Sequence, residues 1–217
     1  IAVKLPVALA GFWELRGYSG EGRKHVQAAL ALPEIQASDV ARAWALYTDA
    51  QLASAQGDHV SAIQALETCL ELRRKLGDAI GVAATLSTLS HARLQAGDVN
   101  GAAVCEFEAL ELFAAADDRY GQAVSWLHRG QIHIWAGHPE NALPDLEQAL
   151  GLARAIGNRE VEAESELVVA QARMLRGETG LAAEAVRRSL KVSQDAADKR
   201  GEAAASWWLG RLAAQAG

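Results

Sequence analysis

Small residues, leucines and polar residues recur in a regular pattern along the chain, and this pattern predicts a series of packed helices and no strands. Leucine recurs at one position in every forty residues, from Leu30 to Leu190, with small residues at fixed places around it. Small side chains let two helices approach closely, and the leucines beside them fill the space between. Alanine and leucine are also the residues with the best helix propensity. The predicted helices cover about residues 3–16, 19–32, 39–56, 59–76, 79–96, 99–116, 119–136, 139–156, 159–176, 179–197 and 199–216.

Glycine recurs at the same interval in the breaks between predicted helices. The six positions are Gly17, Gly57, Gly97, Gly137, Gly177 and Gly217. Glycine can end a helix in a left-handed backbone conformation, and a polar residue after it can start the next helix as a cap or dipole partner. The polar residues in that place are Asp58, Asp98, His138 and Glu178. Each repeat is therefore predicted to be a helix, a tight turn and a second helix.

A second break about twenty residues later separates one repeat from the next. It contains Gly77-Asp78, Asp117-Asp118, Gly157-Asn158 and Ala197-Asp198 in successive repeats. We therefore expect one repeat domain over 1–217, with repeats at about 1–38, 39–77, 78–117, 118–157 and 158–197 and a final unpaired helix at 198–217. The break at Pro33 looks looser, with Asp39 as the next cap. Pro139 suits a first helical turn, whereas Pro144 is expected to bend or delay its helix.

The spacing of the small residues resembles the tetratricopeptide repeat. That signature has a small residue, an alanine twelve positions later and another small residue after seven more. It matches Ala50, Ala62 and Cys69; Ser90, Ala102 and Ala109; Gly130, Ala142 and Ala149; and Ala170, Ala182 and Ser189. The repeats depart from the family in having 40 residues instead of about 34, and they lack the proline that often ends the second helix. Longer helices with the same packing positions account for both differences.

Long repeats of this kind resemble the repeat region of bacterial ATPase-linked transcriptional regulators or adenylate cyclases. The stretch from Phe12 to Leu30 looks like the first repeat of such a region. The resemblance implies an all-α fold, an α-solenoid forming a right-handed superhelix of about five and a half repeats, whose inner surface is lined by the first helix of each repeat. It also implies a sensor that takes up an inducer or a partner protein.

Binding residues are expected on that inner surface. The residue after the first small position is always a hydrogen-bonding one, namely Gln51, His91, Gln131, Gln171 and Arg211. Such a ladder suits the backbone of an extended peptide or a polar small ligand, although solvated polar residues would give the same pattern. Further candidate contacts near it are Tyr47, Thr48, Thr88, His128 and Trp207. Large aromatic anchors often dominate binding energy, whereas Trp126 is predicted to pack between helices.

Composition and charge narrow the possible partners. Half of the residues are hydrophobic and the net charge is −6, with basic residues scattered among acidic ones. Nucleic-acid binding needs clustered Lys and Arg, so no direct nucleic-acid partner is expected. The dense run Arg73-Arg74-Lys75 suits a helix C-terminus. No apolar run is long enough for a membrane span and no signal peptide is found, so we expect a cytoplasmic protein with reduced cysteines at Cys69 and Cys105. The start at Ile1, within the pattern, indicates a fragment of a longer protein.

Metal, cofactor and catalytic sites are not expected. His128 and His133 are five residues apart and do not share a helix face as an i, i+4 pair would. Glu160, Glu162, Glu164 and Glu166 alternate at a spacing of two, which spreads them around a helix, and they suit its N-terminus. The glycines between Gly17 and Gly22 have no strand before them and are not a nucleotide-binding loop.

The sequence therefore favours a protein- or peptide-binding scaffold, as the sensor or interaction domain of a larger bacterial signalling or transcriptional regulator. An alternative is a receptor domain that binds a small-molecule inducer in a pocket inside the superhelix. An enzyme is the third and weakest interpretation. The helix at 198–217 has no later partner, so self-association through it is expected unless further repeats follow.

Overall fold

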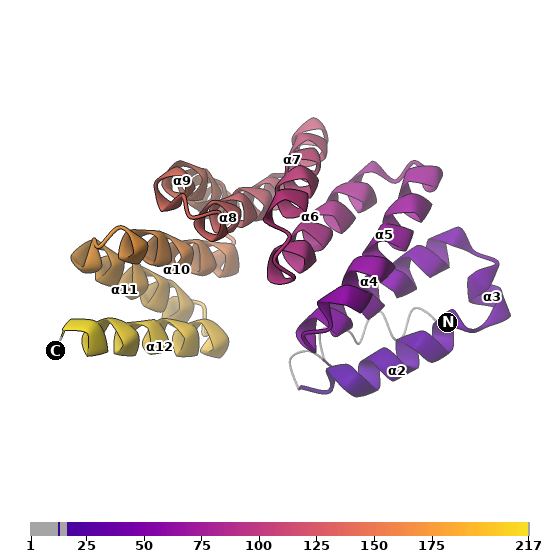
Figure 1. Ribbon diagram of the computed structural model, residues 1–217, viewed down its shortest axis with the longest axis horizontal. Coiled ribbons are helices and arrows are strands. Elements are labelled where there is room, and N and C mark those ends of the chain that lie inside the picture. The colour runs from indigo at the N-terminus through magenta and orange to yellow at the C-terminus, as the bar shows by residue number, and fades with distance from the viewer. Residues whose placement is uncertain (1–12, 14–16, 217) are drawn as a thin grey trace. The chain divides into compact units, whose positions relative to one another are not determined.

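The computed structural model describes Trp13 and residues 17–216, and within these residues all regular structure is helical (Figure 1). The helices are α2 (Ser19–Leu30), α3 (Pro33–Gln36), α4 (Asp39–Ala55), α5 (His59–Leu76), α6 (Ala79–Gln95), α7 (Val99–Ala115), α8 (Arg119–Trp135), α9 (Pro139–Ile156), α10 (Arg159–Leu175), α11 (Thr179–Asp195) and α12 (Lys199–Ala216). The predicted all-α fold is confirmed. The predicted helix at about 3–16 lies outside the described residues except for Trp13.

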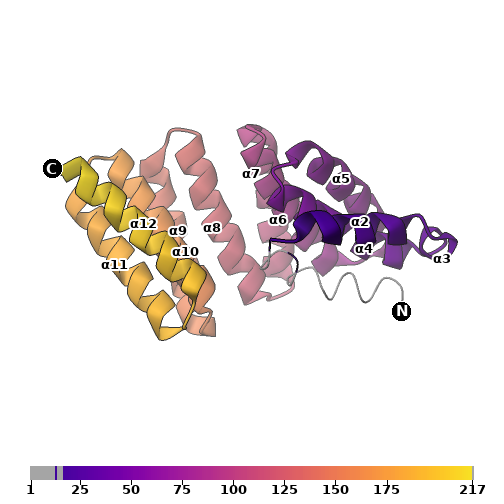
Figure 2. The ribbon, with the colours of Figure 1, turned by 90° about the horizontal axis from the view of Figure 1, so that it is seen from below.

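The chain divides into two compact parts, residues 1–112 and 113–217, which we describe separately. In the N-terminal part, α4 packs against α2 and α5, and α5 packs against α6. In the C-terminal part, α8 packs against α9, and α10 packs between α9 and α11, with α12 following α11 (Figure 2). The first helices of the repeats are α4, α6, α8, α10 and α12, and the second helices are α2, α5, α7, α9 and α11. The organisation of the whole chain as a single domain stays a prediction.

The helix ends follow the glycine pattern. The described repeat glycines from Gly17 to Gly177 all adopt a left-handed backbone, as at Gly97 with φ of 87°. The chain then turns back, and the N–H of Asp58 donates to the carbonyl of Ala53 at 2.9 Å. Asp117 and Ala197 occupy the same conformation at the second break, with φ of 52° and 55°. Gly77 and Gly157 hold that place in two other repeats, with φ of 68° and 71°, so these four breaks share one turn geometry although the residue differs.

Several helix starts in the structure differ from those predicted from the sequence. Ser38, not Asp39, caps α4, because its hydroxyl accepts a hydrogen bond from the N–H of Ala41. The Asp58 and Asp98 side chains cap helices as expected, whereas those of His138 and Glu178 make no such bond. Pro33 starts the short helix α3, which the sequence analysis did not predict. Pro144 does not delay α9, which begins at Pro139 and continues past it.

The small positions form the contacts between helices, as predicted. In the C-terminal part, Ala142, Ala149 and Ala182 are fully buried in one apolar cluster that also contains Leu146. A Cβ atom on Gly130 would lie 2.7 Å from the Leu146 side chain. The second helix therefore lies directly against the small residue of the first helix, which is why the small positions recur in register.

An ion-pair network joins three helices of the N-terminal part. Arg23 of α2 donates from Nη1 to Asp58 Oδ2 at 2.7 Å and from Nε to Asp49 Oδ1 at 3.3 Å. Hydrogen bonds from Ser61 and from Arg23 lower the pKa of Asp58 from its ordinary 3.8 to about 2. Asp49 differs: burial raises the pKa of its carboxyl despite the nearby Arg23.

Asp58→Asn is expected to make stability less sensitive to acid. A carboxyl whose pKa is lowered on folding stabilises the fold above its ordinary pKa, and that contribution is lost as the pH falls through the folded value. The melting temperature of the native chain should therefore fall between about pH 4 and pH 2, and the variant should fall less. Asparagine keeps the helix cap. Asp98→Asn, at the same repeat position but with no ion pair among the described residues, is the control. An equal acid response in native chain and Asp58→Asn would contradict this assignment.

Candidate functional site

The predicted ladder occupies one side of the first helices, which we call the first-helix face. It comprises Gln51, His91, Gln131, Gln171 and Arg211, on α4, α6, α8, α10 and α12 respectively. Gln51 and Arg211 are exposed, and the other three are half-buried. Each side chain thus has a part at the surface.

In the N-terminal part, two of the predicted contacts meet. The Tyr47 hydroxyl lies 2.9 Å from Thr88 Oγ1, which joins α4 to α6. The Arg73 guanidinium lies 4.8 Å from the Tyr47 ring and 5.1 Å from the Trp44 ring, and its Nη1 donates to the Gly81 carbonyl at 2.7 Å. Trp44 is 48 % exposed. The predicted Tyr47 and Thr88 contacts therefore lie beside an exposed tryptophan that a buried arginine supports.

Thr48 was predicted to be a binding contact on the first-helix face, but its side chain is not part of that face. Its side chain is 1 % exposed, and its hydroxyl donates to the Trp44 carbonyl inside α4. One residue after Tyr47, it points about 100° further round the helix and into the packing. His128 is half-buried on α8. Trp126, predicted to pack between helices, is partly buried against the apolar cluster, and the Arg129 guanidinium lies 4.5 Å from its ring.

In the C-terminal part, the first-helix face combines amides with apolar side chains. Gln131 Nε2 donates to Glu164 Oε1 at 3.5 Å between α8 and α10, while its Oε1 is buried with no donor among the described residues. Glu164, Gln171 and Leu175 follow one another at helical spacing on α10. Leu175 and Trp135, forty residues apart, are 59 % and 50 % exposed.

The last described helix continues this face with two tryptophans. Trp207 is 58 % exposed, and the Arg211 guanidinium lies 5.0 Å from the rings of both Trp207 and Trp208. Arginine over an aromatic face is held by the ring quadrupole. The cation of Arg211 is therefore fixed beside an exposed aromatic surface.

Comparison with known proteins by sequence finds no match. No protein-family model matches the chain, and no curated protein matches it either. Solved structures match it in shape. The apo form of RapI aligns with a TM-score of 0.77 at 10 % identity, over 94 % of this chain and 75 % of that one.

Two further matching structures are those of proteins with tetratricopeptide repeats (TPR). A thermophilic TPR protein of Thermus thermophilus aligns with a TM-score of 0.66 at 18 % identity, over 95 % of this chain and 98 % of that one. A signal transduction ATPase with numerous domains (STAND) and a tetratricopeptide repeat sensor, from Pyrococcus horikoshii, gives 0.74 at 14 % identity. That match covers 99 % of this chain and 33 % of the ATPase.

This chain has the tetratricopeptide repeat fold. The match in shape agrees with the small-residue spacing and with the helix–turn–helix order found in both parts. The five ladder residues, spaced forty residues apart, lie at equivalent positions of successive repeats.

The TPR helices also hold a charged cluster that sequence reasoning missed. Glu162 and Glu166 of α10 were expected to spread around the helix without converging, but both are buried, at 5 % and 1 % exposed. Arg154 of α9 donates to both, from Nε to Glu162 Oε1 at 2.9 Å and from Nη2 to Glu166 Oε1 at 3.0 Å. Arg188 of α11 donates from Nε and Nη2 to the two Glu166 oxygens at 2.9 Å each. The expectation was wrong because residues four apart share a helix face.

A signal for this cluster is present in the repeat alignment. The position of Glu166 is occupied by Leu46, Leu86 and Trp126 in the preceding repeats. An acidic residue at an apolar packing position indicates a buried charge with partners on other helices. Burial would raise the pKa of the Glu162 carboxyl, but hydrogen bonds from Arg154 and Arg159 outweigh it and lower that pKa.

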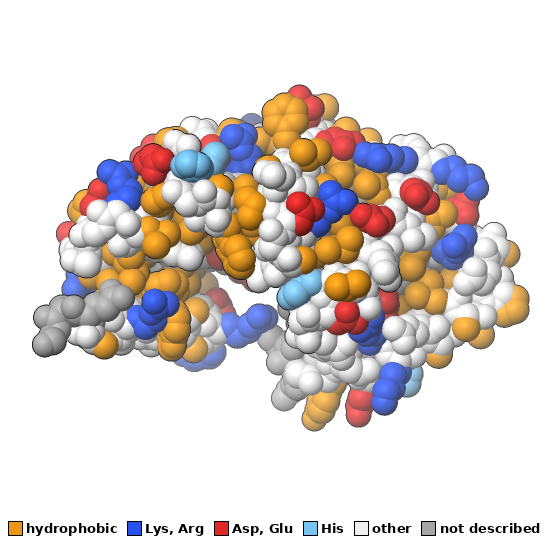
Figure 3. Space-filling model, in the orientation of Figure 1, with side chains coloured by type: hydrophobic (Ala, Val, Ile, Leu, Met, Phe, Trp, Pro, Cys, Tyr) orange, Lys and Arg blue, Asp and Glu red, His pale blue; other side chains and the backbone are white. Residues whose placement is uncertain are grey.

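Other kinds of site find little support among the described residues. Among the residues that the structure describes, no group of three or more His, Cys, Asp or Glu side chains could hold a metal ion. None of the helices described above has the length and apolar character of a bilayer-spanning segment. Burial raises the pKa of both cysteine thiols, which disfavours the reactive thiolate. Basic and acidic side chains are interspersed on the face shown in Figure 3.

Proposed function

We propose that this chain is a scaffold that binds an extended segment of a protein partner along the first-helix face. The observation that carries the proposal is the arrangement on α8, α10 and α12, where Gln131, Gln171 and Arg211 lie beside exposed apolar side chains. An amide can donate to a peptide carbonyl and accept from a peptide N–H. The buried Gln131 Oε1, which has no donor among the described residues, is suited to accept such an N–H.

The apolar side chains supply the second requirement of a peptide site. Trp135, Leu175 and Trp207 are each at least half exposed. Large apolar side chains of this kind release water when a partner side chain covers them, and tryptophan is enriched among residues that dominate binding energy. The partner proposed here is therefore a peptide with regularly spaced apolar residues and free backbone hydrogen-bonding groups.

We further propose that the chain is the sensor or interaction domain of a larger bacterial signalling or transcriptional regulator that works in the cytoplasm. The similarity to the STAND protein supports this, because that protein has a tetratricopeptide repeat sensor. Self-association through α12, or contact with a further repeat, is also proposed, and it would compete with the peptide for Trp207, which is 58 % exposed. The alternative of a small-molecule receptor needs an enclosed site, and the first-helix face consists instead of exposed and half-buried side chains.

Gln131→Ala combined with Gln171→Ala is expected to weaken peptide binding by about tenfold, because two hydrogen bonds of about 0.5–1.5 kcal/mol each are lost. The melting temperature should stay the same, since both side chains reach the surface. Peptides are first selected on the native chain from a random-sequence display library. Their affinities for the native and doubly substituted chains are then compared by calorimetry.

The matched control places the same two substitutions on the second helices, at Gln148 and Gln194, which are exposed on α9 and α11. Selected peptides should bind this control as they bind the native chain. Equal affinity for the variant at Gln131 and Gln171 would remove the first-helix face as the binding site.

A further inference from the structure

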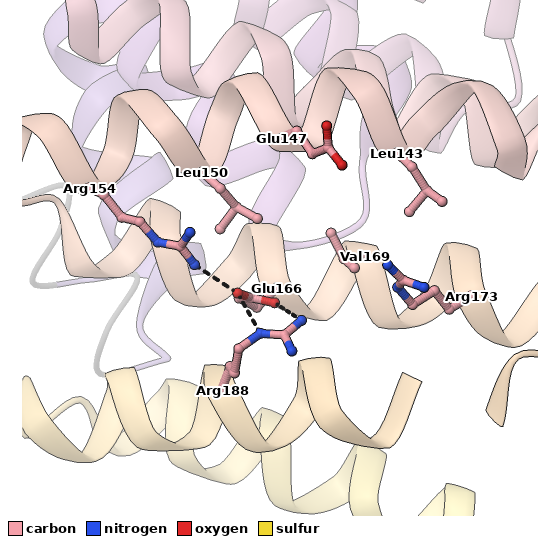
Figure 4. Close-up of a pocket in the computed structure, with 8 residues that line it drawn as sticks. All are labelled: Leu143, Glu147, Leu150, Arg154, Glu166, Val169, Arg173 and Arg188. Atoms are coloured by element: carbon pink, nitrogen blue, oxygen red, sulfur yellow. Dashed lines mark hydrogen bonds and ion pairs between the residues drawn. The ribbon is translucent and has the colours of Figure 1, made fainter. Parts of the chain in front are cut away.

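A pocket of about 280 Å³ lies among α9, α10 and α11, in the C-terminal part (Figure 4). Its lining residues are Leu143, Glu147, Leu150 and Arg154 of α9, Glu166, Val169 and Arg173 of α10, and Arg188 of α11. Val169 and Arg173 are each two residues from Gln171, which places them about 200° away around the helix. The pocket is therefore on the opposite side of α10 from the first-helix face, and it takes no part in the function proposed above.

The pocket lies where this repeat carries two smaller side chains than the preceding repeat does. In the preceding repeat, Trp126 and Arg129 hold the positions of Glu166 and Val169. Trp126 packs against the apolar cluster, and the Arg129 guanidinium covers its ring at 4.5 Å. A carboxylate and a valine in those places fill less volume, so space is left between the helices.

The wall of the pocket is partly apolar and partly cationic. Leu143, Leu150 and Val169 supply the apolar side. Figure 4 shows Glu166 between Arg154 and Arg188, with both arginines bonded to it. Since three arginines and two glutamates line the pocket, its formal charge is +1. An anionic group with an apolar body fits such a lining better than a cation or an uncharged polar molecule does.

Arg173 provides the specific recognition. Its Nη1 donates to Glu178 Oε2 at 3.2 Å, while its Nε is buried with no acceptor among the described residues. The Nε and Nη2 edge of a guanidinium binds a carboxylate with two parallel hydrogen bonds. Arg188 makes that arrangement with Glu166. Arg173 Nε has no described acceptor, and Figure 4 shows the Arg173 guanidinium beside Val169.

We propose that this pocket binds a small organic monocarboxylate, whose carboxylate takes the Nε and Nη2 edge of Arg173 and whose alkyl chain covers Leu143, Leu150 and Val169. The pocket volume corresponds to roughly nine water volumes at about 30 Å³ each. An acid of about eight non-hydrogen atoms, such as hexanoate, is therefore of suitable size. The Glu166 side chain forms a fixed part of the pocket wall, because its oxygens already accept hydrogen bonds from two arginines.

The test is a titration of the whole chain with hexanoate, followed through the NMR signals of the Leu143, Leu150 and Val169 methyl groups. Hexanoate should shift these methyl signals, whereas hexanol, hexylammonium and inorganic phosphate should leave them in place. Arg173→Gln should weaken hexanoate binding by about tenfold or more, because charge-assisted hydrogen bonds are lost. Arg176→Gln is the matched control, since Arg176 also pairs with Glu178, at 2.8 Å, but does not line the pocket.

The same titration defines the results that would overturn the proposal. Absence of methyl shifts with hexanoate, or equal shifts with hexanol or phosphate, would show that the pocket does not select a carboxylate. Unchanged hexanoate affinity in Arg173→Gln would remove the recognition role of that arginine. If Arg173→Gln fails to fold, Val169→Phe tests the site instead. The added ring should fill the pocket and abolish hexanoate binding. Retained binding in Val169→Phe would exclude this pocket as the hexanoate site.

Discussion

Arg188→Met is expected to lower the free energy of unfolding by about 2–3 kcal/mol, because it removes the bidentate partner of a buried carboxylate. Removal of one partner from a buried ion pair usually costs about 3–5 kcal/mol. The value expected here is lower, since Arg154 still donates to Glu166 Oε1 at 3.0 Å. Arg188 is also about half exposed, and water already weakens its interaction with the carboxylate. Chemical denaturation of both chains measures the difference.

Two further variants separate the ion pair from ordinary surface effects. Arg187→Met changes the exposed neighbour on α11 and should leave the free energy of unfolding nearly unchanged. Adding Glu166→Leu to Arg188→Met should restore most of the lost stability, because the unpaired carboxylate is gone and leucine is the residue at Leu46 and Leu86. If Arg188→Met costs no more than Arg187→Met, Glu166 does not depend on Arg188.

Gly130→Leu is expected to cost about 1–3 kcal/mol through overpacking between α8 and α9. Even a Cβ atom at this position would lie 2.7 Å from the Leu146 side chain, which is fully buried. The measurement is the midpoint of thermal or chemical unfolding. A neutral result would mean that α8 and α9 do not pack through the small residue.

The chain offers an unusually close control for this substitution. Gly210 holds the same repeat position on α12, but a Cβ atom there would meet nothing within 4 Å. Gly210→Leu should therefore raise stability by about 0.5–1 kcal/mol, because leucine has the better helix propensity. Opposite signs for one substitution at two equivalent positions would attribute the effect at Gly130 to packing alone.

Most of the fold was predictable from the sequence because packing and chain reversal both recur in register. Glycine at positions such as Gly57 and Gly97 fixes the turns, and small residues fix the helix contacts. The predicted helices from 19–32 onwards, which lie in the described part of the chain, therefore agree with the structure within two residues. The errors occur where that register is locally broken. Pro33 suggested a loose connection, but proline is also favourable at a first helical position, and it starts α3. Ser38 and Asp39 are both good caps, and only the backbone geometry decides between them.

The candidate sites were only partly predictable. The ladder position could be chosen by its spacing, but the burial of Thr48 depends on its exact angle around α4. The acidic residues of α10 were not expected to converge, and the partner of Glu166, Arg188, is 22 residues away in sequence. Its approach to Glu166 depends on how α11 folds back on α10. A break in an apolar repeat position was the available signal, and it identifies a buried charge without naming its partner.

The local pairing of helices has a consequence for how such a chain can gain order and grow. In each part, helices pack chiefly against those next to them in sequence. The loops that must close are therefore short, and the entropic cost of closing each one is small. Order can spread from any repeat to its neighbour, and an added or deleted repeat changes the length of the array without rebuilding the repeats beside it. Evolution can thus extend the surface offered to a partner in steps of one repeat.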